Sequence, residues 1–131
     1  MAAESEKVHN MIYESGEDYL ETILLLQKEK GYVRSIDIAA KLSYSKPSVS
    51  RAMGILRENG YIVMDKSGLI TLTAEGADRA QAVYQRHTTL TRYLHEQLGV
   101  DLAIAEHDAC RMEHILSPET FEKIREKMEE R

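Results

Sequence analysis

The chain has 131 residues, of which 43% are hydrophobic and 30% are charged, and its formal net charge at pH 7 is −5. This length suffices for one compact domain, or two very small ones, with a hydrophobic core that is stable without covalent cross-links. The single cysteine excludes an internal disulfide framework and the first residues lack the apolar segment of a signal peptide, so we expect a cytoplasmic protein without a membrane partner.

Charge is distributed unevenly along the chain. Residues 1–27 carry one Lys against six acids, and residues 67–131 carry eight basic residues against twelve acids. Between them, residues 28–66 carry eight Lys and Arg against four acids. Contact with phosphate depends on local rather than total charge, so this acidic chain is still a candidate for nucleic-acid binding.

A first helix is predicted to begin after Ser15, its N-cap, and to end at Gly31. Its apolar stripe consists of Tyr19, Leu20, Ile23 and Leu24. Asp18 and Glu21 lie off this stripe. A purely structural interpretation makes Asp18 the acidic partner of a capping box with Ser15, and Glu21 a solvated helix residue.

The next segments predict a winged helix-turn-helix. Ser35 followed by IDIAAKL indicates a short second helix, and a third helix has Lys46 and Pro47 in its first turn and ends at Gly60. The β-rich runs YIVMD and LITL, joined by residues 66–68, indicate a hairpin. In this architecture the third helix enters the DNA major groove and the hairpin forms a wing beside it.

The exposed start of the third helix carries short hydroxyls and long cations, which are side chains that contact phosphates and base edges. The candidate DNA-binding residues are Ser45, Lys46, Pro47, Ser48, Ser50 and Arg51, together with Lys66 at the tip of the wing. The structural alternative is that Ser45 only caps the helix while Lys46 and Arg51 are only solvated. The basic segment and the wing together favour double-stranded DNA as the partner.

Helices also dominate the rest of the chain. Thr73 caps a long helical pattern that ends at Gly99, and its apolar stripe consists of Ala77, Ala80, Val83, Tyr84, Leu90, Leu94 and Leu98. Residues 101–116 indicate another helix, and Ser117 with Pro118 begins a last short one. The fold class is therefore predicted to be mainly α with a small β-hairpin.

The predicted helix at residues 101–116 contains the only cysteine. Cys110, Glu113 and His114 are spaced i, i+3 and i+4, so three metal-capable side chains share one helical face. The opposite face carries an apolar stripe of Ala105, Met112, Ile115 and Leu116. The alternative is a buried small thiol beside a solvated Glu and a hydrogen-bonded His, because the repeated C-x-x-C spacing of zinc sites is missing.

Six segments of the chain carry a family resemblance. They are EDYLETI at 17–23, KGYVRSIDIAAKL at 30–42, KPSVSRAMGILRENGYI at 46–62, LTAEG at 72–76, RH at 86–87 and DACRMEH at 108–114. With them the sequence resembles the diphtheria-toxin-repressor and manganese-transport-regulator family of metal-dependent transcriptional repressors. The resemblance covers about residues 13–125 and implies a cytoplasmic homodimer. It also implies a winged helix-turn-helix DNA-binding domain at residues 1–73 and a helical dimerisation and metal-binding domain at residues 74–131. Some family members add an SH3-like third domain, which we do not expect in a chain of this length.

The resemblance further implies a metal site drawn from three helices. Its ligands are Asp18, Glu21, His87, Cys110, Glu113 and His114, and Glu106 is a further candidate one turn before Cys110. Taken by itself, His87 also suits a core histidine. Iron-type members pair the cysteine with a methionine where this chain has Asp18, and manganese-type members have a glutamate at the position of Cys110. The set is therefore a hybrid, and the implied cofactor is Fe²⁺ or Mn²⁺, with Zn²⁺, Co²⁺ or Ni²⁺ as surrogates.

We therefore predict a repressor that senses Fe²⁺ or Mn²⁺, binds a double-stranded DNA operator and controls metal homeostasis genes. No small organic substrate is expected. A thiol enzyme using Cys110 with His114 as base is disfavoured, because no oxyanion-hole loop or Gly-rich pocket is evident, so we expect no enzyme. The second hypothesis is a thiol-based redox-sensing winged-helix regulator, although the chain has no second cysteine to resolve an oxidised Cys110.

Overall fold

The structure, a computed structural model, describes the backbone of residues 2–130 and the side chains of residues 16–130. It contains two compact units, the N-terminal unit (Met1–Gln81) and the C-terminal unit (Ala82–Arg131). The fold is mainly helical with a single two-stranded antiparallel hairpin among the described residues, which confirms the predicted fold class. In the described part of the chain, no helix is long and apolar enough to cross a membrane.

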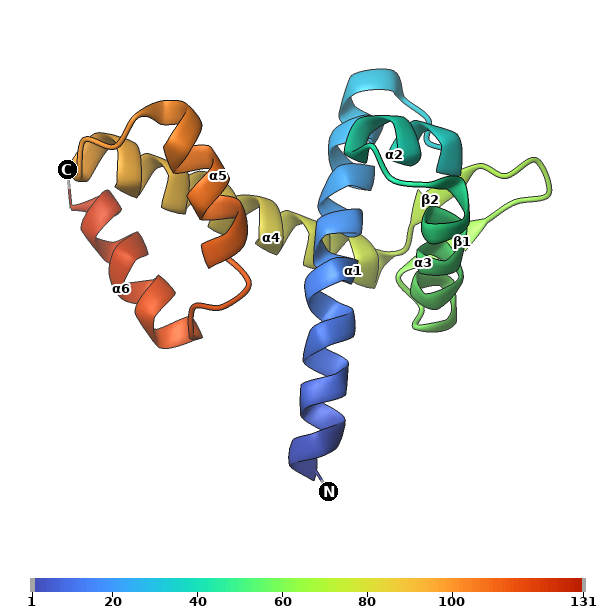
Figure 1. Cartoon of the computed structure of the whole chain (residues 1–131), viewed down its shortest axis with the longest axis horizontal. Coiled ribbons are helices and arrows are strands. Elements are labelled where there is room, and N and C mark those ends of the chain that lie inside the picture. Colours follow the sequence, from blue (N-terminus) through green and yellow to red (C-terminus); the bar gives the residue numbers. More distant parts are fainter. Residues whose placement is uncertain (1, 131) are drawn as a thin grey trace. The chain divides into compact units, whose positions relative to one another are not determined.

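The N-terminal unit has the element order of a winged helix-turn-helix (Figure 1). Its elements are α1 (Ala2–Lys30), α2 (Ser35–Leu42), α3 (Lys46–Glu58), β1 (Ile62–Met64), β2 (Ile70–Leu72) and the first part of α4 (Ala74–Arg92). Its most deeply buried apolar side chains are Leu20, Ile23, Val33, Ile38, Val49, Met53, Ile62 and Ile70. Because α1, α2, α3 and both strands contribute to this one core, the third helix and the wing are fixed to the same support.

Helix α1 begins at Ala2, so the prediction that it begins after Ser15 is wrong. Residues 2–14 contain no Pro or Gly, and several of them are strong helix formers, so nothing upstream of Ser15 stops the helix. The capping-box interpretation of Asp18 fails with it, since Ser15 lies inside the helix. The predicted stripe of α1 is confirmed as core, from 0% exposure at Ile23 to 8% at Tyr19 and Leu24.

Local capping places α3 and the wing as predicted. The Ser45 hydroxyl accepts the backbone N–H of Ser48 at 3.3 Å, and Pro47 lies in the first turn. The strands pair in the register Ile62↔Leu72, Val63↔Thr71 and Met64↔Ile70.

The start of α4 is joined to the base of the wing. The Thr73 hydroxyl accepts the N–H of Gly76 at 3.1 Å and donates to the carbonyl of Gly60 at 2.6 Å. A Cβ atom on Gly76 would lie 1.9 Å from the carbonyl oxygen of Tyr61, so only glycine allows this close approach. This contact explains the glycine of the LTAEG segment.

The C-terminal unit is helical throughout its regular elements. It contains the rest of α4, a π-helical turn η1 (Tyr93–Gln97), α5 (Leu102–Met112) and α6 (Pro118–Glu129). Leu90, Leu94, Ala105 and Ala109 form its buried core cluster, with Phe121 and Ile124 of α6 packed against it. The predicted stripe of the long helix is thus only partly core, because Leu98, beyond the π-helical turn, is 58% exposed.

Candidate metal centre and nucleic-acid interface

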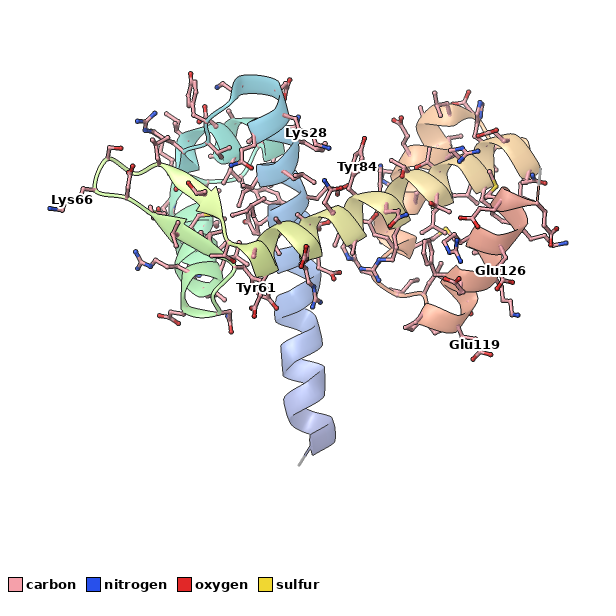
Figure 2. The ribbon with its side chains drawn as sticks, turned by 180° about the vertical axis from the view of Figure 1, so that it is seen from behind. Lys28, Tyr61, Lys66, Tyr84, Glu119 and Glu126 are labelled. Carbon is pink, nitrogen blue, oxygen red and sulfur yellow. The ribbon has the colours of Figure 1, made fainter. Side chains whose placement is uncertain are left out.

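The candidate DNA-binding residues all lie on the surface of the N-terminal unit. Ser45, Lys46, Pro47, Ser48, Ser50, Arg51 and Lys66 are exposed. On α3 the buried Val49 and Met53 face the core, so the polar residues at the start of the helix face outward. Lys66 lies at the tip of the loop between β1 and β2 and points away from the ribbon (Figure 2). A helix with exposed cations beside a wing that carries a lysine is an arrangement suited to duplex DNA.

The other candidate centre lies where α5 ends. Helix α5 ends at Met112 and not at residue 116 as predicted, so Glu113 is its C-cap and residues 113–115 form a turn. The N–H of Glu113 still donates to the carbonyl of Ala109 at 3.0 Å, whereas the N–H of His114 donates to the carbonyl of Arg111 at 3.4 Å. This tighter turn carries Ile115 out to 73% exposure, so its assignment to the core stripe is wrong.

Glu113 is the buried centre of this cluster. The residue is 1% exposed, and its two carboxylate oxygens lie 3.2 Å from His87 Nδ1 and 3.3 Å from His114 Nε2. Neither contact has hydrogen-bond geometry, and no donor among the described residues hydrogen-bonds to either oxygen. A carboxylate removed from water without donors is costly unless a cation approaches it. The alternative in which Glu113 is a solvated residue is therefore wrong.

Sulfur and nitrogen donors surround the same carboxylate. Ligand atoms of His87, Cys110 and Glu113 all lie within 4.8 Å of one another. His87 comes from α4, Cys110 from the last turn of α5, and Glu113 from its cap. An imidazole, a thiol and a carboxylate at this spacing match the donor types of a first-row transition metal. The alternative of a solvated Glu beside a buried thiol does not fit, because Cys110 is half-buried and Glu113 is completely buried.

Three further predicted ligands lie outside the group formed by His87, Cys110 and Glu113. Asp18 and Glu21 lie one turn apart on α1 in the N-terminal unit, where Asp18 is half-buried and Glu21 is 9% exposed. The interpretation of Glu21 as a solvated residue is therefore wrong. Glu106 is exposed on α5 and is not among the donors grouped with Cys110 in the described part of the chain.

The chain matches two family models over almost its whole length. Residues 11–69 match the iron dependent repressor N-terminal DNA binding domain, and residues 73–131 match the iron dependent repressor metal binding and dimerisation domain. The chain belongs to the iron-dependent repressor family. This membership confirms the resemblance to the diphtheria-toxin-repressor and manganese-transport-regulator group, a family of metal-dependent transcriptional regulators.

Curated relatives agree with this assignment. The chain is 39% identical over 109 residues to the transcriptional regulator MntR of Escherichia coli, covering 83% of this chain and 70% of the relative. It is 37% identical over 110 residues to the HTH-type transcriptional regulator MntR of Lysinibacillus sphaericus, covering 84% of this chain and 78% of the relative. It is also 34% identical to an uncharacterized HTH-type transcriptional regulator of Methanocaldococcus jannaschii, covering 88% and 94% of the two chains. None of these names supports the redox-sensing alternative.

Solved structures share the fold. The manganese regulator SloR superposes with a TM-score of 0.78 at 26% identity, and T. acidophilum IdeR with 0.76 at 26% identity. These alignments cover 87% and 86% of this chain, and 53% of each of the solved chains. The chain thus spans about half the length of these two solved structures.

Proposed function

We propose that this protein is a metal-dependent DNA-binding repressor that responds to Fe²⁺ or Mn²⁺ and controls metal homeostasis genes in the cytoplasm. The observation that carries the proposal is the burial of the Glu113 carboxylate beside an imidazole and a thiol. No hydrogen-bond donor among the described residues reaches either oxygen of this carboxylate. In this proposal residues 1–73 bind DNA, and residues 74–131 bind metal and form the dimer.

The proposed ligands are those implied by the family. His87, Cys110, Glu113 and His114 supply donors from the C-terminal unit, and Asp18 and Glu21 of α1 supply carboxylates, with Glu106 as a further candidate. A bound divalent cation supplies the positive charge that compensates these clustered acids. The chain's own part is to present three carboxylates, two imidazoles and one thiolate, of which the thiol and any protonated imidazole must lose a proton.

DNA recognition is assigned to α3 and the wing. Ser48 and Arg51 are proposed to reach base edges, while Ser45, Lys46, Pro47 and Ser50 line the same surface and Lys66 contacts a phosphate. Support comes from the exposure of all seven residues and from the basic character of residues 28–66.

A homodimer is the proposed assembly. The C-terminal unit exposes three large apolar side chains close together in sequence, Leu98 at 58%, Leu102 at 47% and Ile104 at 56%. Exposed aliphatic side chains of this number are unfavourable in water and suit a self-complementary interface. Sedimentation of Ile104→Glu against the parent tests this surface, and an unchanged dimer fraction contradicts it.

Metal-dependent DNA binding is the decisive test. A duplex enriched from random sequence by the Mn²⁺-loaded protein serves as operator probe, and its affinity is measured anaerobically with Mn²⁺, with Fe²⁺ and with chelator. We expect specific binding with either metal and only weak, non-specific binding with chelator. If chelator changes the affinity by less than a factor of two, the proposal fails.

Variants separate the two surfaces of the protein. Arg51→Ala and Ser48→Ala should weaken operator binding by roughly 1–3 kcal/mol without changing metal affinity. Lys66→Ala should lower the salt slope of binding by about one unit. Equal losses of metal affinity in all three variants would show that the assignment of α3 and the wing is wrong.

A further inference from the structure

The tip of the wing is organised by one carboxylate. Asp65 Oδ1 accepts the backbone N–H of Ser67 at 2.9 Å, its hydroxyl at 2.8 Å and the N–H of Leu69 at 2.9 Å. Gly68, with φ of 88°, closes the turn through its N–H to the carbonyl of Asp65 at 3.0 Å. The loop that carries Lys66 is therefore well defined internally. Three residue pairs join its strands, and a two-stranded hairpin of this size is only marginally stable by itself, so the wing depends on contacts with its neighbours.

The connection between α1 and α2 supports the wing from one side. The N–H of Ile70 donates to the carbonyl of Val33 at 2.8 Å, and both side chains are buried. One residue further along the connection, Arg34 Nε donates to the carbonyl of Ser67 at 3.4 Å. Consecutive residues of the connection thus contact the first residue of β2 and the turn that precedes it.

Arg34 itself is fixed from two directions. Its backbone N–H donates to Asp37 Oδ2 at 2.9 Å, and Asp37 Oδ1 accepts Lys30 Nζ at 2.7 Å, so the start of α2 anchors its Cα. Its guanidinium carbon lies 6.0 Å from the centroid of the Tyr32 ring. The Arg34 charge also contributes, after the hydrogen bonds from Ser67 and Leu69, to holding the pKa of Asp65 below its usual value.

We propose that Arg34 is a positioning residue for DNA binding, which by contacting Ser67 directs the neighbouring Lys66 toward a DNA phosphate. The inference rests on the proposed function, because it specifies how the wing meets the duplex. Arg34 is not assigned a DNA contact of its own, because its Nε–H is directed at the wing and the residue is half-buried.

A double-mutant cycle with the enriched duplex and Mn²⁺ separates positioning from direct contact. Lys66→Ala should lower the salt slope by about one unit. Arg34→Ala should produce nearly the same loss of affinity and slope, and the double variant should lose no more than Lys66→Ala alone. Additive losses, with the slope falling by about two units in the double variant, would make Arg34 a phosphate contact and overturn the proposal.

The matched control is Lys41→Ala, which removes one positive charge from the other end of α2, where Lys41 pairs with Glu29 at 3.2 Å. It should leave affinity within a factor of two. A readout without DNA completes the test: backbone ¹⁵N order parameters of residues 66–68 should fall in Arg34→Ala and stay unchanged in Lys41→Ala. Equal order parameters in the parent and Arg34→Ala overturn the proposal. A parent that binds no DNA overturns the proposed function instead, and this inference falls with it.

Discussion

Two acids of the N-terminal unit, Asp37 and Asp65, are held differently from Glu113 of the C-terminal unit. In the N-terminal unit, Asp65 accepts three hydrogen bonds from its own turn, and Asp37 accepts from Lys30 and from the backbone of Arg34. These contacts lower the pKa of both carboxyls, chiefly through Ser67 for Asp65 and through Lys30 for Asp37. In the C-terminal unit, Glu113 is fully buried beside two imidazoles, and no described residue hydrogen-bonds to its oxygens.

The difference separates acids that build the fold from an acid that is suited to bind a ligand. Asp37 and Asp65 accept hydrogen bonds from the chain itself, so Asp37 serves to cap α2 and Asp65 serves to order the turn of the wing. Glu113 has two buried acceptor oxygens without a hydrogen-bond donor among the described residues, which raises the free energy of the metal-free protein. A bound cation would compensate that cost, so the stability of the C-terminal unit is expected to depend on metal.

The largest expected effect comes from removing the Glu113 charge. Glu113→Gln keeps the side-chain volume, and it should lower Mn²⁺ affinity by at least about 100-fold, because even residues that only support metal ligands are worth about 10- to 100-fold. The metal-free variant should unfold at the same temperature as the parent or higher, since a buried charge has been removed. Isothermal titration and calorimetry measure the two effects. The control Asp108→Asn changes an exposed acid on the same helix, at 53% side-chain exposure, and should change neither.

A steric change should break the N-terminal unit instead. Gly76→Ala places a methyl group 1.9 Å from the Tyr61 carbonyl oxygen, and overpacking of this kind costs about 1–3 kcal/mol. The thermal midpoint should fall by roughly 4–8 °C for each kcal/mol. Gly54→Ala, in the middle of α3 with nothing within 4 Å of the new Cβ, should instead stabilise by up to about 1 kcal/mol. Equal midpoints for the two variants would contradict the close approach.

Much of the N-terminal unit was predictable because its signals are local. Ser45 with Pro47, the Ser67–Gly68 turn and Thr73 each specify a boundary within a few residues, and each boundary is found where it was predicted. Ser15 is the same kind of capping residue, but the helix start predicted from it was wrong. A capping residue begins a helix only where the preceding residues do not continue the helix, and α1 begins at Ala2. A local preference is therefore informative only together with its neighbours.

The features that escaped prediction depend on the folded chain. Periodicity assigned Glu113 to a polar face, but its burial follows from packing that no helical wheel contains. Ile115 and Leu98 were expected in the core and are exposed, since a turn and a π-helical segment change the direction of the helix. Arg34 lay within a recognised segment, yet its partner Ser67 is 33 residues away, and no local pattern connects them.

A smaller effect should sharpen the chemistry of the C-terminal site. Cys110→Glu replaces a soft thiolate with hard oxygen donors, which favour Mn²⁺ relative to Fe²⁺. We expect the ratio of activating Fe²⁺ to Mn²⁺ concentrations to rise by about tenfold, which is roughly 1.4 kcal/mol. Asp18→Met should move the ratio the other way, and Cys110→Ser serves as the control without charge. Anaerobic titrations of DNA binding measure the ratio, and an unchanged value in Cys110→Glu would remove the thiolate from the metal.

The smallest effect belongs to the satisfied acids and concerns pH. Hydrogen bonds from Ser67 lower the pKa of Asp65 in the folded protein. This carboxylate therefore stabilises the wing at any pH above its unfolded pKa of about 3.9. The contribution is lost as the pH falls through the lower, folded pKa. The amide resonances of Ser67 and Leu69 should therefore stay constant from pH 7 to about 5 and shift with a midpoint below about 3.9. The amide of Met53, in the buried core, monitors global unfolding over the same range.

In Asp65→Asn, which keeps an acceptor oxygen and cannot ionise, the local transition should disappear. A midpoint in the parent at or above 3.9 would show that the Asp65 hydrogen bonds do not favour the charged form, and would place the wing acid in the same class as an unsatisfied carboxylate.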